Sequence, residues 1–295
     1  MLAKPALLEG LVRAGISLRK LNALPAASGL RLKLGLLEDR SPAPVVSLRQ
    51  TPSQGEILYF TGCLARHLQP SVATATEKLL QQCGLSSAAP EGQTCCGLAA
   101  WSGGSREQAR ELAKKNIEVF ADSSEMIITS CASCSSHLFT YPDLFAPDDP
   151  WHKRACAFAE RVREFTDFFR TSLPTPDRKK TGKKVFYHDP CHLKFTGKGR
   201  QTPRELLKKM GLQVVESCQG SSCCGQGGLF HLAYPASSAA IFAKTAEGAL
   251  VHQPDYVTTT CSGCLMQYQE GFARSQEETE VIHLALLLDA LYGRD

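Results

Sequence analysis

Short apolar runs alternate with longer segments of helical periodicity along most of this chain. Each run has three or four mostly apolar or β-branched residues, which is typical of a buried strand. The four runs are 57–60, 126–129, 185–187 and 256–259. Because helical segments separate them, the pattern predicts small, mostly parallel sheets with right-handed crossovers, in an α/β fold.

Helix start signals flank the helical segments. T-x-x-E capping boxes at 74–77 and 202–205 predict helices that begin at these points. Ser105 starts another capping box, and the apolar residues after it recur at helical spacing: Ala109, Leu112, Ala113, Ile117 and Phe120. An apolar stretch at 280–291 predicts a C-terminal helix, which we interpret as the counterpart of a helix around 160–169.

The chain is an internal duplication. Within each copy the order is a single Cys, a Cys-Cys-Gly triplet and a Cys-x-x-Cys pair. The first two features recur after 128 positions and the third after 130, a drift that a loop absorbs. We divide the chain into a basic N-terminal arm (1–54), a first repeat (55–172) and a second repeat (183–295). The first repeat holds Cys63, Cys95, Cys96, Cys131 and Cys134, and the second holds Cys191, Cys223, Cys224, Cys261 and Cys264.

The repeat pattern places these cysteines at one edge of each sheet. In each copy the single Cys and the Cys-x-x-Cys pair follow predicted strands closely. The carboxyl ends of parallel strands share one rim, and open α/β sheets bind their ligands there. We therefore expect each copy to gather its five cysteines at one rim, although more than thirty positions separate some of them.

Composition and charge narrow the class of protein. Apolar residues make up 43% of the 295 positions and charged residues 21%, so the composition is that of a folded globular chain. Residues 1–50 carry eight Lys or Arg against three Asp or Glu, and the rest carries 25 against 26, so we expect no nucleic-acid partner. The arm has no apolar run long enough to span a bilayer. Its leucines beside basic residues predict an amphipathic helix that docks on a partner subunit.

The number of cysteines argues for metal or redox chemistry. Thirteen cysteines, about 4% of the chain, are too few for a disulfide scaffold, so we assign the chain to the reducing cytoplasm. Thiolates bind soft metals, and five together would repel one another unless a cation or cluster compensated them. Adjacent cysteines suit a multi-iron cluster better than one tetrahedral zinc, because their side chains diverge. Buried inert thiols and redox disulfides are the alternatives.

Three histidines lie close to these cysteines in the sequence. His188 and His192 flank Cys191, and His137 follows Cys134 by three positions. A mixed Cys/His metal site is one interpretation. We favour a hydrogen bond beside a cluster, and such a donor to a cluster sulfur would raise the reduction potential.

These features resemble the duplicated cysteine-rich CCG domain of the heterodisulfide reductase B subunit, the glycolate oxidase iron-sulfur subunit and lactate-utilization proteins of the LutA type. The resemblance covers roughly residues 55–292. It rests on the ten cysteines in order and spacing, with Tyr-His-Asp-Pro-Cys-His-Leu at 187–193 and Pro-Arg-Glu-Leu-Leu at 203–207. It implies that each set of five cysteines binds a 4Fe-4S cluster, of the non-cubane type found in the heterodisulfide reductase B subunit. Some relatives hold zinc in one motif, so zinc at one of the two sites stays an alternative.

The chain departs from the glycolate oxidase subunit in one respect. It has no ferredoxin-like segment with C-x-x-C-x-x-C-x-x-x-C-P runs, so we expect a ferredoxin-like iron-sulfur partner to supply any cubane clusters. It also has no recognisable flavin or nicotinamide motif. The substrate-oxidising flavin is therefore expected on a flavoprotein dehydrogenase partner.

The resemblance implies an iron-sulfur electron-transfer subunit of a complex that oxidises a small 2-hydroxy acid, lactate or glycolate. Such a subunit would pass electrons to a quinone or another acceptor, as a cytoplasmic protein with peripheral membrane contact through its complex. Two alternatives remain. One is a catalytic subunit that reduces a disulfide, as in heterodisulfide reductase, and the other is a zinc-stabilised interaction scaffold.

Overall fold

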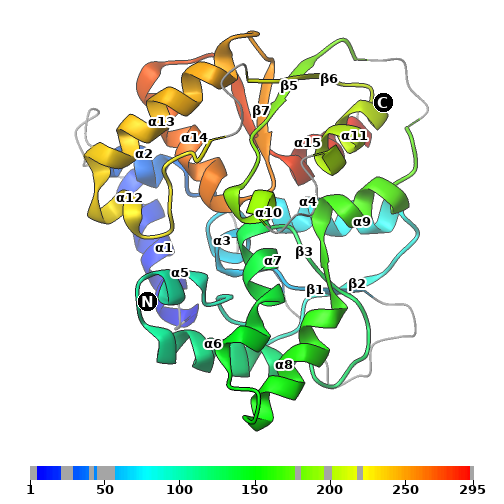
Figure 1. The fold of residues 1–295 in the computed structure, drawn as a ribbon. Helices are drawn as coiled ribbons and strands as arrows, with labels where there is room; N and C mark the ends of the chain where they lie inside the picture. The colour runs from blue at the N-terminus through cyan, green and yellow to red at the C-terminus, as the bar shows by residue number, and fades with distance from the viewer. Residues whose placement is uncertain are drawn as a thin grey trace. The chain divides into compact units, whose positions relative to one another are not determined.

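The computed structural model describes residues 5–20, 29–39, 43–44, 57–176, 181–195, 201–217 and 222–292. The chain divides into two compact units, Met1–Glu164 and Phe165–Asp295 (Figure 1). Each unit contains a four-stranded parallel sheet flanked by helices. The predicted α/β fold class with two similar repeats is confirmed.

The sheet of the first unit has the strand order β2-β1-β3-β4, and all neighbouring strands pair in parallel. Its strands are β1 (Ile57–Tyr59), β2 (Ser87–Ala88), β3 (Ile127–Thr129) and β4 (Val162–Glu164). The connections contain α3 (Cys63–His67), α4 (Pro70–Gln82), α5 (Leu98–Ser102), α6 (Arg106–Val119), α7 (Ala132–Phe139), the 3-10 helix η1 (Tyr141–Leu144) and α8 (Pro150–Arg161).

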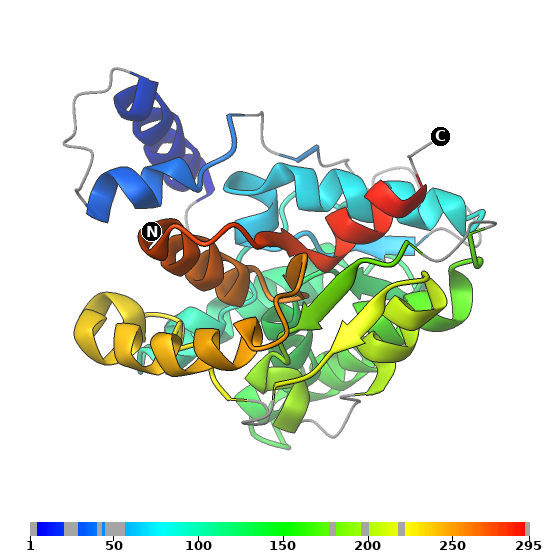
Figure 2. The same cartoon turned by 90° about the horizontal axis from the view of Figure 1, so that it is seen from above.

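The sheet of the second unit repeats this order as β6-β5-β7-β8, again with parallel neighbours. Its strands are β5 (Lys184–Tyr187), β6 (Gln213–Val215), β7 (Tyr256–Thr259) and β8 (Glu280–His283). The helices are α9 (Phe165–Ser172), α10 (Cys191–Phe195), α11 (Gln201–Lys209), α12 (Phe230–Ala233), α13 (Pro235–Leu250), α14 (Ser262–Ser275) and α15 (Leu284–Tyr292). In Figures 1 and 2, α13 and α14 lie side by side on one face of this sheet, and α11 covers the other.

The shared strand order creates a switch point in each unit. In the first unit the chain goes from β1 to the neighbouring edge strand β2. It then crosses to the opposite side of β1, where it forms β3 and β4. The second unit follows the same path with β5, β6, β7 and β8. The switch point lies between β1 and β3 in the first unit and between β5 and β7 in the second. Open α/β sheets bind ligands at the carboxyl ends of the strands at such a point.

The four strands predicted from apolar runs are confirmed as β1, β3, β5 and β7. The sequence analysis missed the outer strands of both sheets. β2 has only two residues, and β6 carries an exposed Gln213, so neither shows a buried apolar run. The stretches around 160–169 and 280–291 are indeed counterparts, but each begins with a short edge strand, β4 or β8, before its helix.

The capping box at 74–77 does not mark a helix start. α4 begins four residues earlier, with Pro70 at its first position, where the fixed φ and the missing N–H suit a helix. Thr74 lies inside this helix, and its hydroxyl donates to the carbonyl of Pro70 at 3.3 Å. The prediction for α6 was better, because Ser105 stands at its N-cap position.

Aromatic side chains fill the core beside each sheet. In the first unit, Phe120 lies against Phe60 at 6.0 Å and against Phe158 at 5.8 Å between ring centroids, and Tyr141 stacks on Phe158. In the second unit, Phe242, Tyr268 and Phe272 contact one another in edge-on geometry. Together with the buried aliphatic side chains, these aromatics supply the apolar area that stabilises the small sheets.

The N-terminal arm contains two helices, α1 (Pro5–Lys20) and α2 (Gly29–Gly35), so the predicted amphipathic helix is present. Leu8 and Ile16 are buried, whereas Leu7 and Leu11 are exposed. Within the described part of the chain, no helix combines the length and apolarity needed to cross a bilayer. The residue boundaries predicted for the arm and the two repeats stay a prediction; α9, which that division put in the first repeat, packs on α11 in the second unit.

Close packing of α13 on α14 makes one glycine indispensable. A Cβ atom at Gly271 would overlap the ring of Phe242, whose side chain is buried. Gly271→Ala is therefore expected to lower the free energy of unfolding by about 1–3 kcal/mol, although alanine is the better helix former.

Gly10→Ala is the matched control for this change, measured by urea unfolding. Gly10 lies within α1, and nothing lies within 4 Å of a Cβ atom built there. The control should keep or raise its unfolding midpoint, because alanine favours the helix and meets no neighbour there. An equal midpoint for Gly271→Ala and the unsubstituted protein would contradict the packing argument.

Candidate functional site

In the first unit, three connections bring five cysteines to the carboxyl rim of the sheet. Cys63 begins α3 after the short loop 60–62 that follows β1, and Cys131 stands at the N-cap of α7, separated from β3 by Ser130. Cys134 lies in the first turn of α7, while the Cys95–Cys96 pair precedes α5. The positive ends of helix dipoles thus point toward the sulfur atoms, which favours thiolates.

The five sulfur atoms of the first unit contact one another in a continuous series. The Sγ atoms of Cys63 and Cys95 are 3.7 Å apart, and Cys95 in turn contacts Cys96. Cys134 contacts both Cys96 and Cys131. All five are free thiols, four of them buried. The predicted gathering of this set is what the structure shows.

Gly62, in the loop between β1 and α3, lets the backbone lie close to the sulfur of Cys134 on α7. Its φ of 72° lies in the left-handed region, and a Cβ atom there would come within 3.2 Å of the sulfur of Cys134. Only glycine meets both demands without strain.

The crowded thiols of the first unit cannot all ionise. The thiol of Cys63 donates to Cys95, and this hydrogen bond with that of Cys96 lowers the pKa of Cys95 to about 3. The same contact raises the pKa of Cys63 well above its usual range, and contacts with Cys131 and Cys96 raise that of Cys134. The thiolate of Cys95 beside the protonated thiols of Cys63 and Cys134 is an arrangement that a metal would replace, because metal binding releases those protons.

Polar side chains of the core fix the backbone of the Cys95–Cys96 pair. Asn116 donates through Nδ2 to the carbonyl of Cys95 at 3.1 Å and accepts from the N–H of Thr94 at 2.8 Å. The hydroxyl of Tyr141 donates to the carbonyl of Cys96 at 2.9 Å. The sequence analysis missed Asn116. The feature that could have revealed it is its position on the buried, otherwise apolar face of α6, where a polar side chain needs a hydrogen-bond partner.

The second unit repeats this arrangement of sulfur atoms. Cys191 begins α10 after β5, and Cys261 caps α14 after β7. Cys223 contacts both Cys191 and Cys224. Cys264 contacts both Cys224 and Cys261, so the predicted second set of five is also brought together.

Backbone and hydroxyl groups hold the second Cys-Cys-Gly triplet. The N–H of Gly225 donates to the sulfur of Cys223 at 3.3 Å, and a Cβ atom at Gly225 would lie 2.6 Å from the carbonyl oxygen of Ser238. Thr245 donates to the carbonyl of Cys223 at 2.8 Å, the same role that Asn116 has in the first unit. Different side chains therefore fix the two triplets.

The electrostatics of the second set follow the same rule. Hydrogen bonds from Cys191 and Cys224 lower the pKa of Cys223 to about 2. The contact with Cys223 raises the pKa of Cys191 and brings that of Cys224 to about 12. The second set is more accessible to solvent than the first, because Cys223 is exposed and Cys191 is half-buried.

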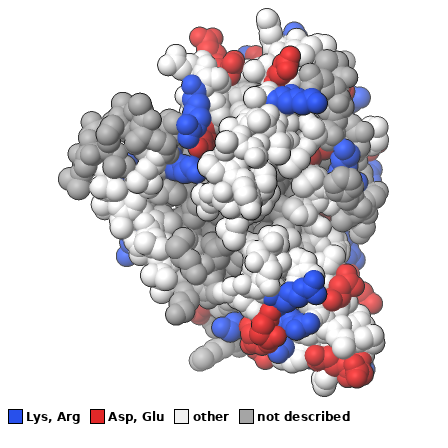
Figure 3. Space-filling view, turned by 60° about the vertical axis from the view of Figure 1, so that its left-hand side comes forward, with Lys and Arg blue, Asp and Glu red and all other residues white. Residues whose placement is uncertain are grey.

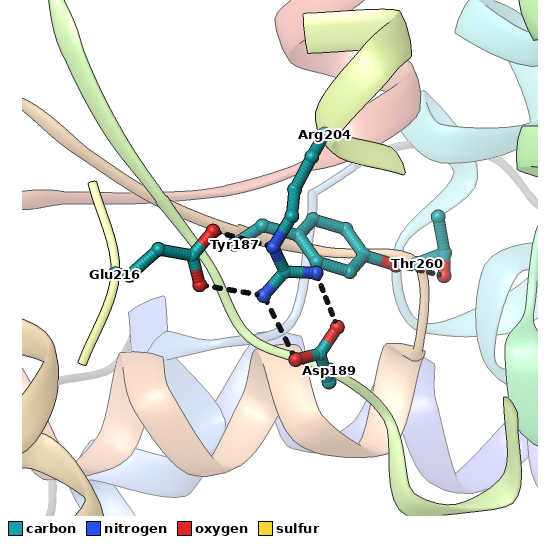
Figure 4. A network of polar contacts seen from close by, with 5 residues as sticks. All are labelled: Tyr187, Asp189, Arg204, Glu216 and Thr260. Carbon is teal, nitrogen blue, oxygen red and sulfur yellow. Dashed lines mark hydrogen bonds and ion pairs between the residues drawn. The ribbon is translucent and has the colours of Figure 1, made fainter. Parts of the chain in front are cut away.

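A buried ion pair holds the loop that carries Cys191 (Figure 4). Arg204 on α11 donates to both carboxylate oxygens of Asp189, at 2.7 and 2.9 Å, and to Glu216 after β6 at 2.5 and 2.9 Å. The guanidinium also lies 5.8 Å from the ring centre of Tyr187, whose hydroxyl contacts Thr260. This network fixes the ends of β5, β6 and β7 relative to one another.

The first unit uses neutral groups at the corresponding place. The N–H of Thr61, the position equivalent to Asp189, donates to Gln93 at 2.8 Å, and Gln93 donates to the carbonyl of Pro90 at 3.0 Å. The hydroxyl of Tyr59 contacts Ser130 at 2.7 Å, as Tyr187 contacts Thr260. Arg204 belongs to the motif at 203–207 quoted above, but the sequence did not reveal its partners, nor those of Gln93.

The three candidate histidines have different surroundings. A ring nitrogen of His188 and the sulfur atoms of Cys224 and Cys264 lie within 4.8 Å of one another, and burial lowers the pKa of His188 to about 4. His137 is buried on α7, and its Nε2 lies 3.4 Å from a Cβ atom built on Gly97. The Nδ1 of His192 lies 3.9 Å from the sulfur of Cys191.

The donor sets fit a soft metal centre. Each unit offers five thiols that contact one another in a series and form no disulfide, and adjacent cysteines contribute two of them. Thiolates select iron-sulfur clusters, zinc or copper(I), and five of them exceed the four that one tetrahedral ion takes. A structure with two such pockets can therefore hold two thiolate-ligated metal centres.

Comparison with known proteins supports a shared origin of this arrangement. The family model of the CCG cysteine-rich domain matches residues 57–139 and again 185–269. Lactate utilization protein A of Shouchella clausii (strain KSM-K16) is 33% identical over 233 residues, which are 78% of this chain and 97% of that protein. Lactate utilization protein A 2 of Bacillus cereus (strain AH820) is 30% identical over 236 residues, or 79% and 97% of the two chains.

Two further relatives are similar over part of their own length. The probable glycolate oxidase iron-sulfur subunit of Bacillus subtilis (strain 168) is 31% identical over 250 residues, which cover 81% of this chain and 55% of that protein. The crystal structure of a hypothetical protein from Helicobacter pylori superposes with a TM-score of 0.60 at 10% identity, covering 95% of this chain and 57% of that one. At this identity the likeness shows the fold alone.

Replacement of one cysteine should empty one site only. Cys96→Ser removes the sulfur that links Cys95 to Cys134, so we expect about half of the bound metal to be lost, together with some stability. Metal content of anaerobically purified protein measures this. Cys156→Ser is the control, because Cys156 lies on α8 outside both sets. Equal metal content in the two variants would show that Cys96 is not a ligand.

Loss of the buried arginine should destabilise the second unit. Arg204→Ala leaves the buried carboxylate of Asp189 without its partner, so the free energy of unfolding should fall by about 3–5 kcal/mol. Urea unfolding measures the change, with Arg274→Ala as control. Arg274 pairs with Glu270 on the exposed side of α14, and its loss should cost about 0–1 kcal/mol. Equal effects of the two substitutions would refute a structural role of the buried pair.

Proposed function

This chain belongs to the family of proteins with cysteine-rich CCG domains, and from that premise we propose that it is an iron-sulfur subunit of an oxidoreductase complex. The observation that carries the proposal is the contact among five free thiols at the carboxyl rim of each sheet. Two such pockets in one chain suit electron transfer better than a single structural metal, because each redox centre can take up and release an electron.

The chain's residues supply the ligands and their orientation. We assign Cys63, Cys95, Cys96, Cys131 and Cys134 to the first centre, and Cys191, Cys223, Cys224, Cys261 and Cys264 to the second. A 4Fe-4S cluster of cubane or non-cubane type, when bound, supplies one-electron transfer. Asn116 and Thr245 hold the carbonyl groups that set the direction of the adjacent cysteines. The glycine N–H groups after each pair donate to sulfur, at 3.5 Å in the first unit and 3.3 Å in the second.

The finer proposal concerns substrate and partners. The relatives' names, lactate utilization protein and glycolate oxidase iron-sulfur subunit, support a complex that oxidises a small 2-hydroxy acid. Hydride removal from such an acid needs a cofactor such as flavin, for which this chain has no recognisable motif. We therefore place the flavin on a partner dehydrogenase, and further clusters on a ferredoxin-like partner, with this chain between the flavin and the final acceptor.

The surface beside the second centre supports electron exchange with a partner. No Lys, Arg, Asp or Glu occurs between Glu216 and Lys244, a segment that contains the exposed Cys223. Within it, large apolar side chains of and beside α12 and α13 are exposed: Leu229, Leu232, Tyr234 and Ile241. Figure 3 is turned so that the side of Figure 1 on which α12 and α13 are labelled comes forward, and it shows uncharged surface across the middle of the view. Uncharged, apolar surface of this kind is typical of protein interfaces.

The exposure of Cys223 also favours a second candidate function. A substrate disulfide can reach a centre whose ligand lies at the surface, whereas four of the five cysteines of the first centre are buried. Reduction of a disulfide at the second centre, as in heterodisulfide reductase, is therefore the alternative. It requires two electrons, and each of the two centres would deliver one.

Anaerobic purification separates these proposals from a zinc scaffold. We expect a brown protein with several irons and acid-labile sulfides per chain, and with electron paramagnetic resonance signals after reduction. A colourless protein with stoichiometric zinc and no iron would contradict the iron-sulfur assignment. The double variant Cys96→Ser, Cys224→Ser should lose the iron while Cys156→Ser keeps it.

The electron-transfer role is tested with the flavoprotein that co-purifies from the native host. Addition of lactate or glycolate should then reduce the clusters of this chain, observed as bleaching of visible absorption. Clusters that the hydroxy acid leaves oxidised, but that a disulfide substrate reoxidises after chemical reduction, would favour the disulfide reductase instead.

A further inference from the structure

The two centres differ at one pair of core positions. His188 follows β5 at the position that Phe60 occupies after β1, 128 residues earlier. Tyr268 on α14 likewise corresponds to Leu138 on α7, 130 residues earlier. All four side chains are buried. The second unit therefore has a polar pair where the first has an apolar one.

The geometry aims the imidazole of His188 at the sulfur atoms. Its Nδ1 lies 3.3 Å from the hydroxyl of Tyr268, and the two rings are 5.1 Å apart between centroids. Its Nε2 is buried and has no hydrogen-bond partner among the described residues. A ring nitrogen of His188 lies within 4.8 Å of the sulfur atoms of both Cys224 and Cys264. Since Nδ1 contacts Tyr268, Nε2 is the ring nitrogen left to donate a hydrogen bond to this pair.

A buried nitrogen without a partner needs an explanation. Such a group costs about 1–3 kcal/mol, and an apolar side chain at the same place would avoid the cost, as Phe60 does in the first unit. The neighbouring groups that Nε2 can serve are sulfur atoms. Its position therefore makes sense when those sulfurs belong to a metal centre that accepts a hydrogen bond.

We propose that His188 is a positioning residue that donates a hydrogen bond from Nε2 to a sulfur atom of the second centre, and that Tyr268 sets its tautomer. The Tyr268 hydroxyl donates to Nδ1, which leaves the ring proton on Nε2. An N–H dipole beside sulfur stabilises the more negative, reduced state of an iron-sulfur centre, and so raises its reduction potential. This inference rests on the proposed iron-sulfur function and adds that the second centre is tuned separately from the first.

The first centre has its own histidine, but on a different element. His137 comes from α7 and lies near Gly97, whereas the residue of α14 equivalent to it, Gln267, donates to Ser238 at 3.3 Å. A histidine directly after the first strand of the sheet, His188, is therefore a feature of the second unit, since the first unit has Phe60 there. Substitutions at His188 and Tyr268 should act on the second centre and leave the first unchanged.

The test uses the full chain, purified anaerobically, in which the midpoint potentials of both centres are followed by redox titration and electron paramagnetic resonance. The variants are His188→Phe, which copies the first unit, Tyr268→Phe, which removes only the hydroxyl, and His188→Gln, which keeps an N–H donor. We expect full iron content in all three. His188→Phe should shift the midpoint potential of the second centre to a more negative value, and Tyr268→Phe should cause a smaller negative shift. In His188→Gln the potential should lie between those of His188→Phe and the unsubstituted protein, because an N–H donor remains.

Three results would overturn the inference. Unchanged potentials in His188→Phe and Tyr268→Phe, with full iron content, would show that neither side chain acts on the centre, while the iron-sulfur function stands. Loss of iron from the second centre in a folded His188→Phe protein would show that His188 is a ligand and not a hydrogen-bond donor. Absence of iron from the unsubstituted protein would overturn the proposed function and the inference with it.

If His188→Phe fails to fold, Tyr268→Phe decides alone, because it deletes one oxygen and keeps the ring packing against Phe242 and Phe272. A negative shift of the second potential in this variant supports the relay from Tyr268 to His188. The same potential as in the unsubstituted protein contradicts it.

Discussion

The structure depends on the repulsion that five crowded cysteine sulfurs would feel if all were ionised. Hydrogen bonds from neighbouring thiols lower the pKa of Cys95 in the first unit and of Cys223 in the second, while the same contacts raise the pKa of Cys63 and of Cys191. Such a pocket has no advantage for stability alone, since apolar side chains would pack there at lower cost. It becomes favourable when positive charge replaces the protons, which is why we interpret both pockets as metal centres.

The fold provides this crowding through a simple duplication. The same strand order in both units places a switch point at the carboxyl ends of two central strands, and the cysteines begin the helices that follow. The side chains that hold the cysteine-bearing loops in place differ between the two units. A neutral contact from Gln93 holds the first rim, whereas the buried pair of Arg204 and Asp189 holds the second. The duplicated units thus share a ligand pattern but differ in charge and access.

The sequence predicted the parts of the fold that follow from local pattern. Buried central strands show as apolar runs, and the cysteine repeat shows directly, so β1, β3, β5, β7 and both sets of thiols could be predicted. Edge strands such as β2 and β6 lack that signal, because pairing with a neighbour stabilises them more than their own composition does. Asn116, Arg204 and the pairing of His188 with Tyr268 could not be predicted, since their partners lie far away in sequence and meet only in the folded chain.

The most direct measurement of the central claim is iron anomalous scattering from crystals grown without oxygen. The account predicts strong iron peaks at both sheet rims, one within bonding distance of the sulfurs of Cys63 to Cys134 and one beside those of Cys191 to Cys264. Crystals with no iron at either rim, or with a single zinc ion bound by four sulfurs at each, would contradict it.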